Sequence, residues 1–156
     1  MIIGKLKIHI GYKLLFIISS VIIISLTGCS HKVAIYVQAA NDLNNGGNPV
    51  VVRLYQLTTD MNFKSETSES FWRSNQISFQ RDIVGETKEI ILHPREVLKL
   101  EKIKINKNAN FLAVAADFYQ PDKDQWQYIY DVSKYKSKKL LLAVRKNSLV
   151  ITKVEK

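Results

Sequence analysis

The sequence predicts an all-β protein, an antiparallel β-sandwich of about eight short strands with one short helical segment. Apolar residues either alternate with polar ones or run continuously over short stretches, which is the pattern of half-buried and central strands. Turn-forming residues separate these stretches at regular intervals, and a single region departs from the strand pattern. Together these features favour two packed sheets.

Length and composition bound the protein further. A chain of 156 residues with 46% apolar residues is long enough for one domain, or for one domain with a short appendage. The single cysteine excludes an internal disulfide framework and a metal site made of several thiolates. Only three histidines are present, which argues against histidine-based catalysis.

The first 28 residues are typical of a lipoprotein signal peptide. Three lysines and no acidic residue precede the uncharged stretch Leu14–Leu26, which at 13 residues is short for a bilayer span. The stretch closes on Leu26-Thr27-Gly28-Cys29, which resembles the bacterial lipobox. We therefore expect residues 1–28 to be removed and Cys29 to carry covalent lipid. The alternatives are an ordinary signal peptide and an uncleaved anchor.

This interpretation sets the domain organisation and the location. Residues 29–32 form the acylated start and a short tether, and residues 33–156 form the sandwich domain. Several acyl chains on one cysteine hold a protein persistently, whereas one chain gives marginal attachment. Ser30, rather than Asp, follows the cysteine, which by the usual bacterial sorting rule indicates the outer membrane, with the protein facing the periplasm.

The predicted strands begin at Val33–Val37, where apolar residues alternate. Asn41–Asn48 (NDLNNGGN) is a loop of turn formers, and Pro49 then introduces the β-branched strand Val50–Leu57. Its alternation places Val50, Val52 and Leu54 on the core face, and Arg53 and Tyr55 opposite.

Residues 58–75 are expected to form two to three helical turns packed by aromatic side chains, with Asp60 as a helix cap. The remaining strands follow in order. They are expected at Glu89–His93, at Val97–Ile105 with a bulge near Glu101-Lys102, at Phe111–Phe118 as a central strand, around Trp126, Tyr128 and Tyr130 on one face, and in a hairpin of Lys139–Arg145 with Leu149–Val154.

The sequence gives only weak signals for a phosphate-binding, metal or catalytic site. The Gly-rich loop lacks the lysine and following helix of a phosphate-binding loop, and Asp122 with Asp124 reads as a turn rather than a calcium or other metal site. His93 has no nucleophile motif, so we expect no catalytic residue, no enzyme activity and no cofactor beyond the lipid on Cys29. The alternative function is a lipidated periplasmic binding protein for a small ligand or glycan, with Trp72, Trp126 and nearby tyrosines as stacking surfaces.

The chain carries a net positive charge, but its basic residues are spread along the sequence. Without residues 1–28 the chain keeps 20 Lys+Arg against 14 Asp+Glu, a net charge of +6. Two loose groups of lysines stand out, at Lys99, Lys102, Lys104 and Lys107 and at Lys134, Lys136, Lys138 and Lys139. A nucleic-acid partner is not expected for a periplasmic protein without interleaved exposed aromatics. We favour solvated lysines that protect sheet edges, with contacts to acidic lipid or protein surfaces as the alternative.

A lipid-anchored chain without catalytic groups is expected to act by holding a partner. Binding then requires a loop carried on a rigid scaffold, and the best candidate is the loop between the first two strands. Its residues are Asn41, Asp42, Leu43, Asn44, Asn45, Gly46, Gly47 and Asn48.

Three segments together resemble one known family. Pro49 is followed by an apolar run and then by Arg53-x-Tyr55-Gln56-Leu57, residues 89–96 read EIILHPRE, and residues 111–126 read FLAVAADFYQPDKDQW. In this order, and with the lipobox, they resemble the outer-membrane lipoprotein of the bacterial type VI secretion system, the TssJ or SciN family. Arg95 stands where the family usually has Gly, and the loop before Pro49 lacks the family's usual second proline.

The resemblance implies a transthyretin-like β-sandwich with an added helical segment. It also implies a role without catalysis, in which the lipoprotein holds the periplasmic C-terminal region of the large inner-membrane component, TssM, at the outer membrane. In the family, the loop between the first two strands carries much of that contact, which here corresponds to Asn41–Asn48.

Overall fold

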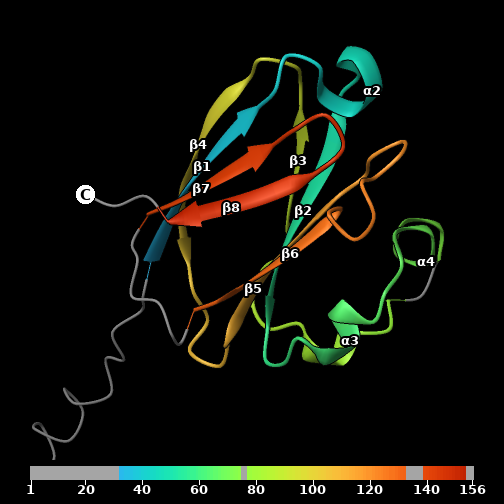
Figure 1. The fold of residues 1–156 in the computed structure, drawn as a ribbon. Helices are drawn as coiled ribbons and strands as arrows, with labels where there is room; N and C mark the ends of the chain where they lie inside the picture. The colour runs from blue at the N-terminus through green and yellow to red at the C-terminus, as the bar shows by residue number, and fades with distance from the viewer. Residues whose placement is uncertain (1–31, 75–76, 133–138, 154–156) are drawn as a thin grey trace, which may run out of the picture.

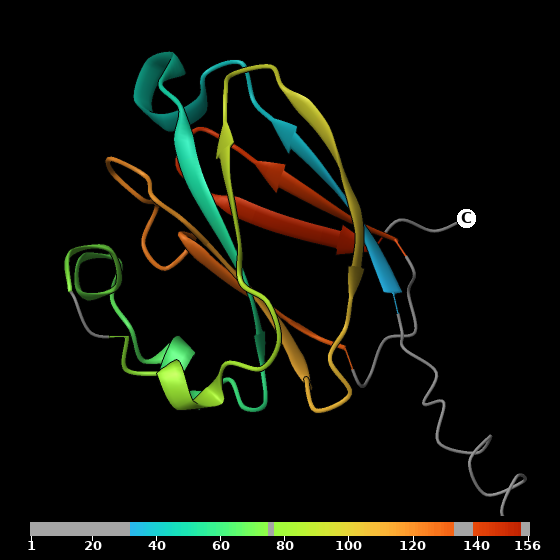
Figure 2. The same cartoon turned by 180° about the vertical axis from the view of Figure 1, so that it is seen from behind.

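The computed structural model describes residues 32–74, 77–132 and 139–153. The predicted signal peptide, Cys29, and Lys134, Lys136 and Lys138 lie outside the described residues. Eight strands form two four-stranded sheets, ordered β4-β1-β7-β8 and β3-β2-β5-β6 (Figures 1 and 2). The strands are β1 Lys32–Ala39, β2 Val50–Leu57, β3 Lys88–Leu92, β4 Val97–Lys104, β5 Phe111–Ala116, β6 Gln127–Asp131, β7 Lys139–Val144 and β8 Leu149–Lys153. The predicted eight-stranded sandwich is confirmed.

One strand pair departs from the antiparallel prediction. β1 and β7 run parallel, from Ala34 opposite Lys139 to Ala39 opposite Val144, whereas the other strand pairs are antiparallel. Parallel neighbours need a long connection, and here the connection includes the whole second sheet. Local sequence pattern carries no information about so distant a pairing.

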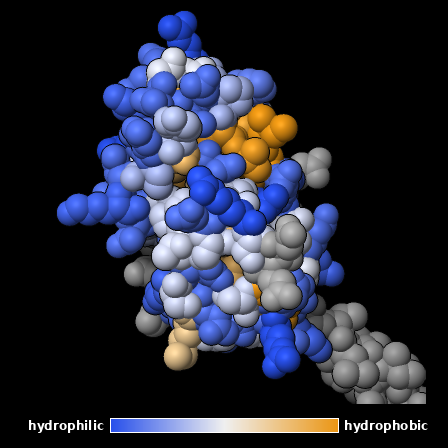
Figure 3. Space-filling view, turned by 90° about the vertical axis from the view of Figure 1, so that its right-hand side faces the viewer, coloured by the Kyte–Doolittle hydropathy of each residue, from blue (hydrophilic) through white to orange (hydrophobic). Residues whose placement is uncertain are grey.

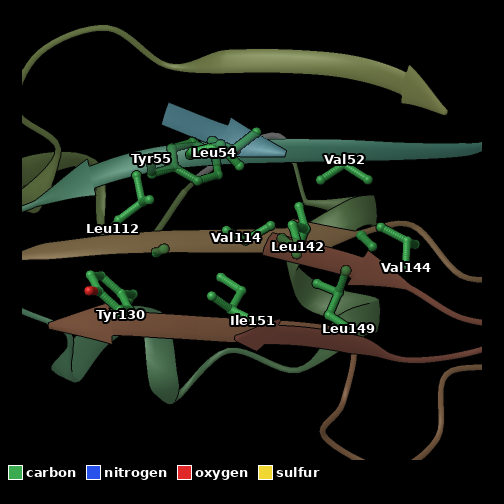
Figure 4. Packing of buried hydrophobic residues seen from close by; sticks show 14 of the residues in the cluster. Val52, Leu54, Tyr55, Leu112, Val114, Tyr130, Leu142, Val144, Leu149 and Ile151 are labelled. Carbon is green, nitrogen blue, oxygen red and sulfur yellow. The ribbon is translucent and has the colours of Figure 1, made fainter. Parts of the chain in front are cut away.

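The core lies between the sheets. Val52, Leu54 and Val114 of one sheet point toward Leu142 and Ile151 of the other (Figure 4). All of these side chains are buried, as the alternation of β2 and the continuous apolar run of β5 predicted. β5 is also central, because β2 and β6 pair with it on either side.

The predicted bulge is present. Val33 of β1 pairs with Ile103 of β4, but Ile35 pairs with Leu100, so β4 contributes one extra residue between these two pairs. The extra residue falls within Glu101-Lys102, where the apolar phase of the sequence changes.

The helical segment covers the outer face of β2. It consists of α3 (Met61–Lys64), α4 (Ser68–Arg73) and a 3₁₀ turn (Gln80–Asp82), shorter pieces than the two to three turns predicted. Thr67 caps α4 through a reciprocal hydrogen-bond pair with Ser70. Asp60 occupies the capping position of α3 without a side-chain cap bond and instead forms an ion pair with Lys64.

Aromatic rings fix this segment to the sheet. Tyr55, which faces away from the core, lies within 5.3–6.3 Å (ring centroids) of Phe63, Phe71 and Phe79. Trp126 joins the same cluster, 5.1 Å from Phe71. The prediction that Trp126 shares a face with Tyr128 and Tyr130 is therefore wrong, because Trp126 precedes β6 and its ring packs under the helices.

Among the described residues, none of the helices has the length and apolar character needed to cross a membrane.

Replacing Phe63 by alanine tests the aromatic cluster. Phe63 is 0% exposed, so we expect Phe63→Ala to lower the free energy of unfolding by about 3–5 kcal/mol in urea titrations. The matched control is Met61→Ala in the same helix, where the side chain is 75% exposed and the expected change is within about 0.5 kcal/mol. Equal effects of the two substitutions would contradict the packing described above.

Candidate protein-interaction site

The loop between β1 and β2 is an ordered turn. The segment α2 (Leu43–Gly47) holds four consecutive residues with positive φ, namely Asn44 (47°), Asn45 (59°), Gly46 (102°) and Gly47 (104°). Asn and Gly are the residue types that tolerate this left-handed conformation. The sequence Asn-Asn-Gly-Gly therefore specifies a left-handed turn within the predicted loop.

Asn44 connects this turn to three other segments of the chain. Its side-chain amide donates to the carbonyl oxygen of Pro49 (2.8 Å) and accepts from the backbone N–H of Tyr119 (2.8 Å). The backbone N–H of Asn44 also donates to the carbonyl oxygen of Lys146 (2.8 Å). One side chain thus connects α2 to the start of β2 and to the segment after β5, and its backbone connects to the β7–β8 turn.

Two of the eight residues predicted for partner contact are buried. Leu43 is 0% exposed and packs in the core, and Asn44 is 8% exposed, so neither can touch a partner directly. Asn41, Asp42, Asn45, Gly46 and Asn48 are exposed, and Gly47 is half-buried. The burial of Leu43 and Asn44 holds the exposed residues of the loop in place.

Exposed apolar side chains gather at the same end of the molecule. Of the four large exposed apolar residues in the described part of the chain, three lie here: Ile91, Val97 and Tyr119. Tyr119 is 76% exposed and is held by Asn44, Ile91 pairs with Val51 close to Pro49, and Val97 pairs with Gln38 at the end of β1. We call α2 and its flanking exposed residues, with these three side chains, the α2 end.

Ile91, Val97 and Tyr119 were not among the residues predicted for partner contact. Their signal is weak, because an exposed apolar residue on a strand looks like any other residue of the non-core phase. Seen from the side that carries α2, the surface is mostly hydrophilic with one compact apolar area (Figure 3).

A second left-handed position supports the α2 end. Arg95 has a φ of 67°, and its backbone N–H donates to the carbonyl oxygen of Ala40 (3.3 Å). The backbone at Arg95 thus has the left-handed conformation that favours Gly. Gly is the usual residue at this position in the family that the sequence resembles. The turn after Pro94 thus places a non-glycine residue, Arg95, in the left-handed conformation.

A charge cluster occupies the outer face of β2 farther from α2. Arg53 donates to Glu89 (2.7 Å) and its guanidinium lies 4.7 Å from the centre of the Trp72 ring. Burial would lower the pKa of Arg53, but the hydrogen bond to Glu89 and the nearby Tyr55 outweigh it and raise that pKa. Burial raises the pKa of Tyr55 and of Asp117, and in both cases Arg53 opposes the rise. These contacts hold α4 on the sheet.

The two tryptophans of the glycan-binding alternative are engaged by other side chains of the protein. Trp126 is 2% exposed, and one side of the Trp72 ring is covered by Arg53 while its neighbour Phe71 lies 4.9 Å away. Trp126 is therefore closed to a sugar, and one face of the Trp72 ring is occupied by Arg53.

A groove of about 690 Å³ opens between the edge strands β3 and β4. Gln56 lies at its floor, but the side chain of Gln56 already donates to the carbonyl oxygen of Lys104 (3.2 Å) and accepts from the backbone N–H of Asn106 (2.7 Å). The polar group best placed to orient a ligand is thus used to join the two sheets. Within residues 32–74, 77–132 and 139–153, no cluster of three metal-ligating side chains occurs.

Residues 31–147 match the model of the type VI secretion lipoprotein family that includes VasD, EvfM and TssJ. The chain belongs to this family. No curated protein sequence matches the chain. The fold is similar to that of the type VI lipoprotein TssJ1 from Pseudomonas aeruginosa, with a TM-score of 0.70 and 22% identity over 81% of this chain and 98% of that one.

Two further structures of the type VI system have a similar fold. A chain of a type VI membrane complex matches with a TM-score of 0.70 and 22% identity, over 79% of this chain and 98% of that one. A chain in a structure described as the TssM C-terminal domain from EAEC matches with a TM-score of 0.65 and 24% identity, over 79% of this chain and 98% of that one. At these identities the likeness establishes a common fold.

Removing the side chain of Asn44 tests its role in connecting the turn to other segments. Asn44→Gly preserves the left-handed backbone but loses both side-chain hydrogen bonds, so we expect the free energy of unfolding to fall by about 1–3 kcal/mol. Asn45→Gly is the control, because Asn45 has the same backbone conformation and an exposed side chain. A change within about 0.5 kcal/mol is expected there by chemical denaturation. A neutral Asn44→Gly variant would remove Asn44 from this role.

Proposed function

We propose that this family member is the lipid-anchored outer-membrane component of a type VI secretion membrane complex. In this proposal, acyl chains on Cys29 fix the chain to the outer membrane, and the sandwich holds the periplasmic C-terminal region of TssM. Support comes from the family match and from similar folds in structures whose descriptions name a type VI membrane complex and the TssM C-terminal domain.

The observation that carries the proposal is the course of β1. This strand begins at Lys32, three residues after Cys29, and leads directly into α2. Eight strand residues extend about 26 Å at roughly 3.3 Å per residue. The start of β1 and α2 therefore lie at opposite ends of the body (Figure 1). A lipid on Cys29 then directs the α2 end away from the membrane, toward a partner that comes from the inner membrane.

The α2 end has the composition of a protein interface. Ile91, Val97 and Tyr119 supply exposed apolar area, and the turn around Asn45 supplies polar groups on a rigid backbone. A preformed turn loses little conformational entropy on binding, which favours affinity. We therefore assign TssM contact to the exposed residues of Asn41–Asn48 together with these three side chains, and we assign no catalytic role to the chain.

Lipid anchoring is tested by Cys29→Ser. Cys29 is the only cysteine in the chain, so the substitution removes the attachment point for lipid. We therefore expect the variant to be lost from the outer-membrane fraction and to incorporate no labelled palmitate. Ser30→Ala, one residue away, is the control and should stay in that fraction. Outer-membrane retention of the Cys29→Ser protein would show that lipid is not the anchor.

Partner contact is tested by Tyr119→Ala. Buried interface tyrosines commonly contribute about 2 kcal/mol or more, so we expect affinity for the TssM C-terminal region to fall roughly thirtyfold in calorimetry. Met61→Ala is the matched control, since Met61 is equally exposed but lies in α3, outside the α2 end. Equal affinities of the two variants would exclude Tyr119 from the contact.

A further inference from the structure

The end of the sandwich opposite α2 is basic. Lys104 ends β4, Lys32 begins β1 and Lys139 begins β7, and these are three neighbouring strands of one sheet. All three side chains are exposed. We call these three lysines the basic end.

Two of these lysines face each other directly. Lys32 and Lys104 are Cα partners in the antiparallel β1–β4 pair. Like charges in such opposed positions destabilise a sheet. Neither Lys32 nor Lys104 takes part in the ion pairs Arg53–Glu89, Lys64–Asp60 and Arg73–Glu69, and Glu86 lines the groove together with Lys104 without forming an ion pair with it. The opposed lysines therefore gain from an external negative charge.

Protection of a sheet edge does not explain the whole group. Lys104 lies on the edge strand β4, where a lysine discourages pairing with other chains. Lys32 and Lys139 lie on β1 and β7, which have hydrogen-bonded neighbours on both sides. The interpretation of edge lysines therefore fits the position of Lys104 but not that of Lys139, and Lys32 belonged to neither of the two lysine groups.

We infer that the basic end contacts anionic lipid headgroups of the membrane to which the chain is tethered. The inference rests on the lipid anchor proposed above. Two residues, Ser30 and His31, lie between Cys29 and Lys32, and three extended Cα–Cα steps reach at most about 10 Å. A tether this short lets Lys32, and Lys104 opposite it, come within the Debye length of about 8 Å at physiological salt, where their attraction to a charged surface is not fully screened. The contact orients the sandwich and keeps the α2 end pointing into the periplasm.

The test uses the mature chain 29–156 carrying Cys29→Ser, which is unacylated but retains both sheets and the whole described core. Its binding to phosphatidylglycerol-containing vesicles and to neutral phosphatidylcholine vesicles is measured by sedimentation at several salt concentrations. We expect binding to the anionic vesicles alone, weakening as salt rises.

The lysine pair is then removed. A lysine near an anionic surface contributes about fivefold in affinity, so Lys32→Gln with Lys104→Gln should weaken vesicle binding roughly thirtyfold. The matched control is Lys123→Gln with Lys146→Gln, which removes the same charge from two exposed lysines next to the α2 end and should change binding less than twofold.

Three results would overturn the inference. They are equal binding to anionic and neutral vesicles, equal weakening by the two lysine pairs, and competition by millimolar inorganic phosphate, which would indicate an ion site instead of a membrane surface. None of these depends on acylation, so a failed Cys29→Ser fractionation test and a failed vesicle test remain distinct.

Discussion

The fold depends on the burial of β2 on both faces. Val52 and Leu54 pack into the core between the sheets, while Tyr55 packs under the rings of Phe63 and Phe71 on the other side. A strand covered twice must be apolar in both phases, which explains the β-branched run that follows Pro49. Gln56 adds the polar connection, because its side chain bonds to the end of β4 in the opposite sheet and to the residues that follow it. The helical segment, the core and the junction of the two sheets all meet on this strand.

β1 connects two ends of the molecule that differ in chemistry. It pairs with β4 on one side and β7 on the other, and it runs from the basic end to the α2 end without interruption. The two ends differ in chemistry: lysines gather at the first and exposed apolar side chains at the second. A body with such polarity can face a charged membrane surface with one end and a protein with the other. The membership of the type VI secretion lipoprotein family accords with such a role.

Rigidity of the α2 end comes from backbone conformation as much as from packing. Four consecutive left-handed residues would be costly for most sequences, but Asn and Gly accept this conformation. The hydrogen bonds of Asn44 then connect the turn to segments that lie far away in the sequence, at Tyr119 and Lys146. A loop of this kind presents its exposed residues in a fixed arrangement, so little order has to be gained when a partner binds.

The sequence alone determined the strands, the bulge near Glu101-Lys102 and the family, because alternation, turn residues and local phase are properties of neighbouring residues. Only the tertiary structure decided that β1 and β7 run parallel, that Trp126 leaves its predicted face and that Leu43 and Asn44 are buried within a loop of polar composition. It also decided which apolar residues stay exposed together at the α2 end. Each of these features depends on contacts between segments distant along the chain, and local pattern carries no record of such contacts.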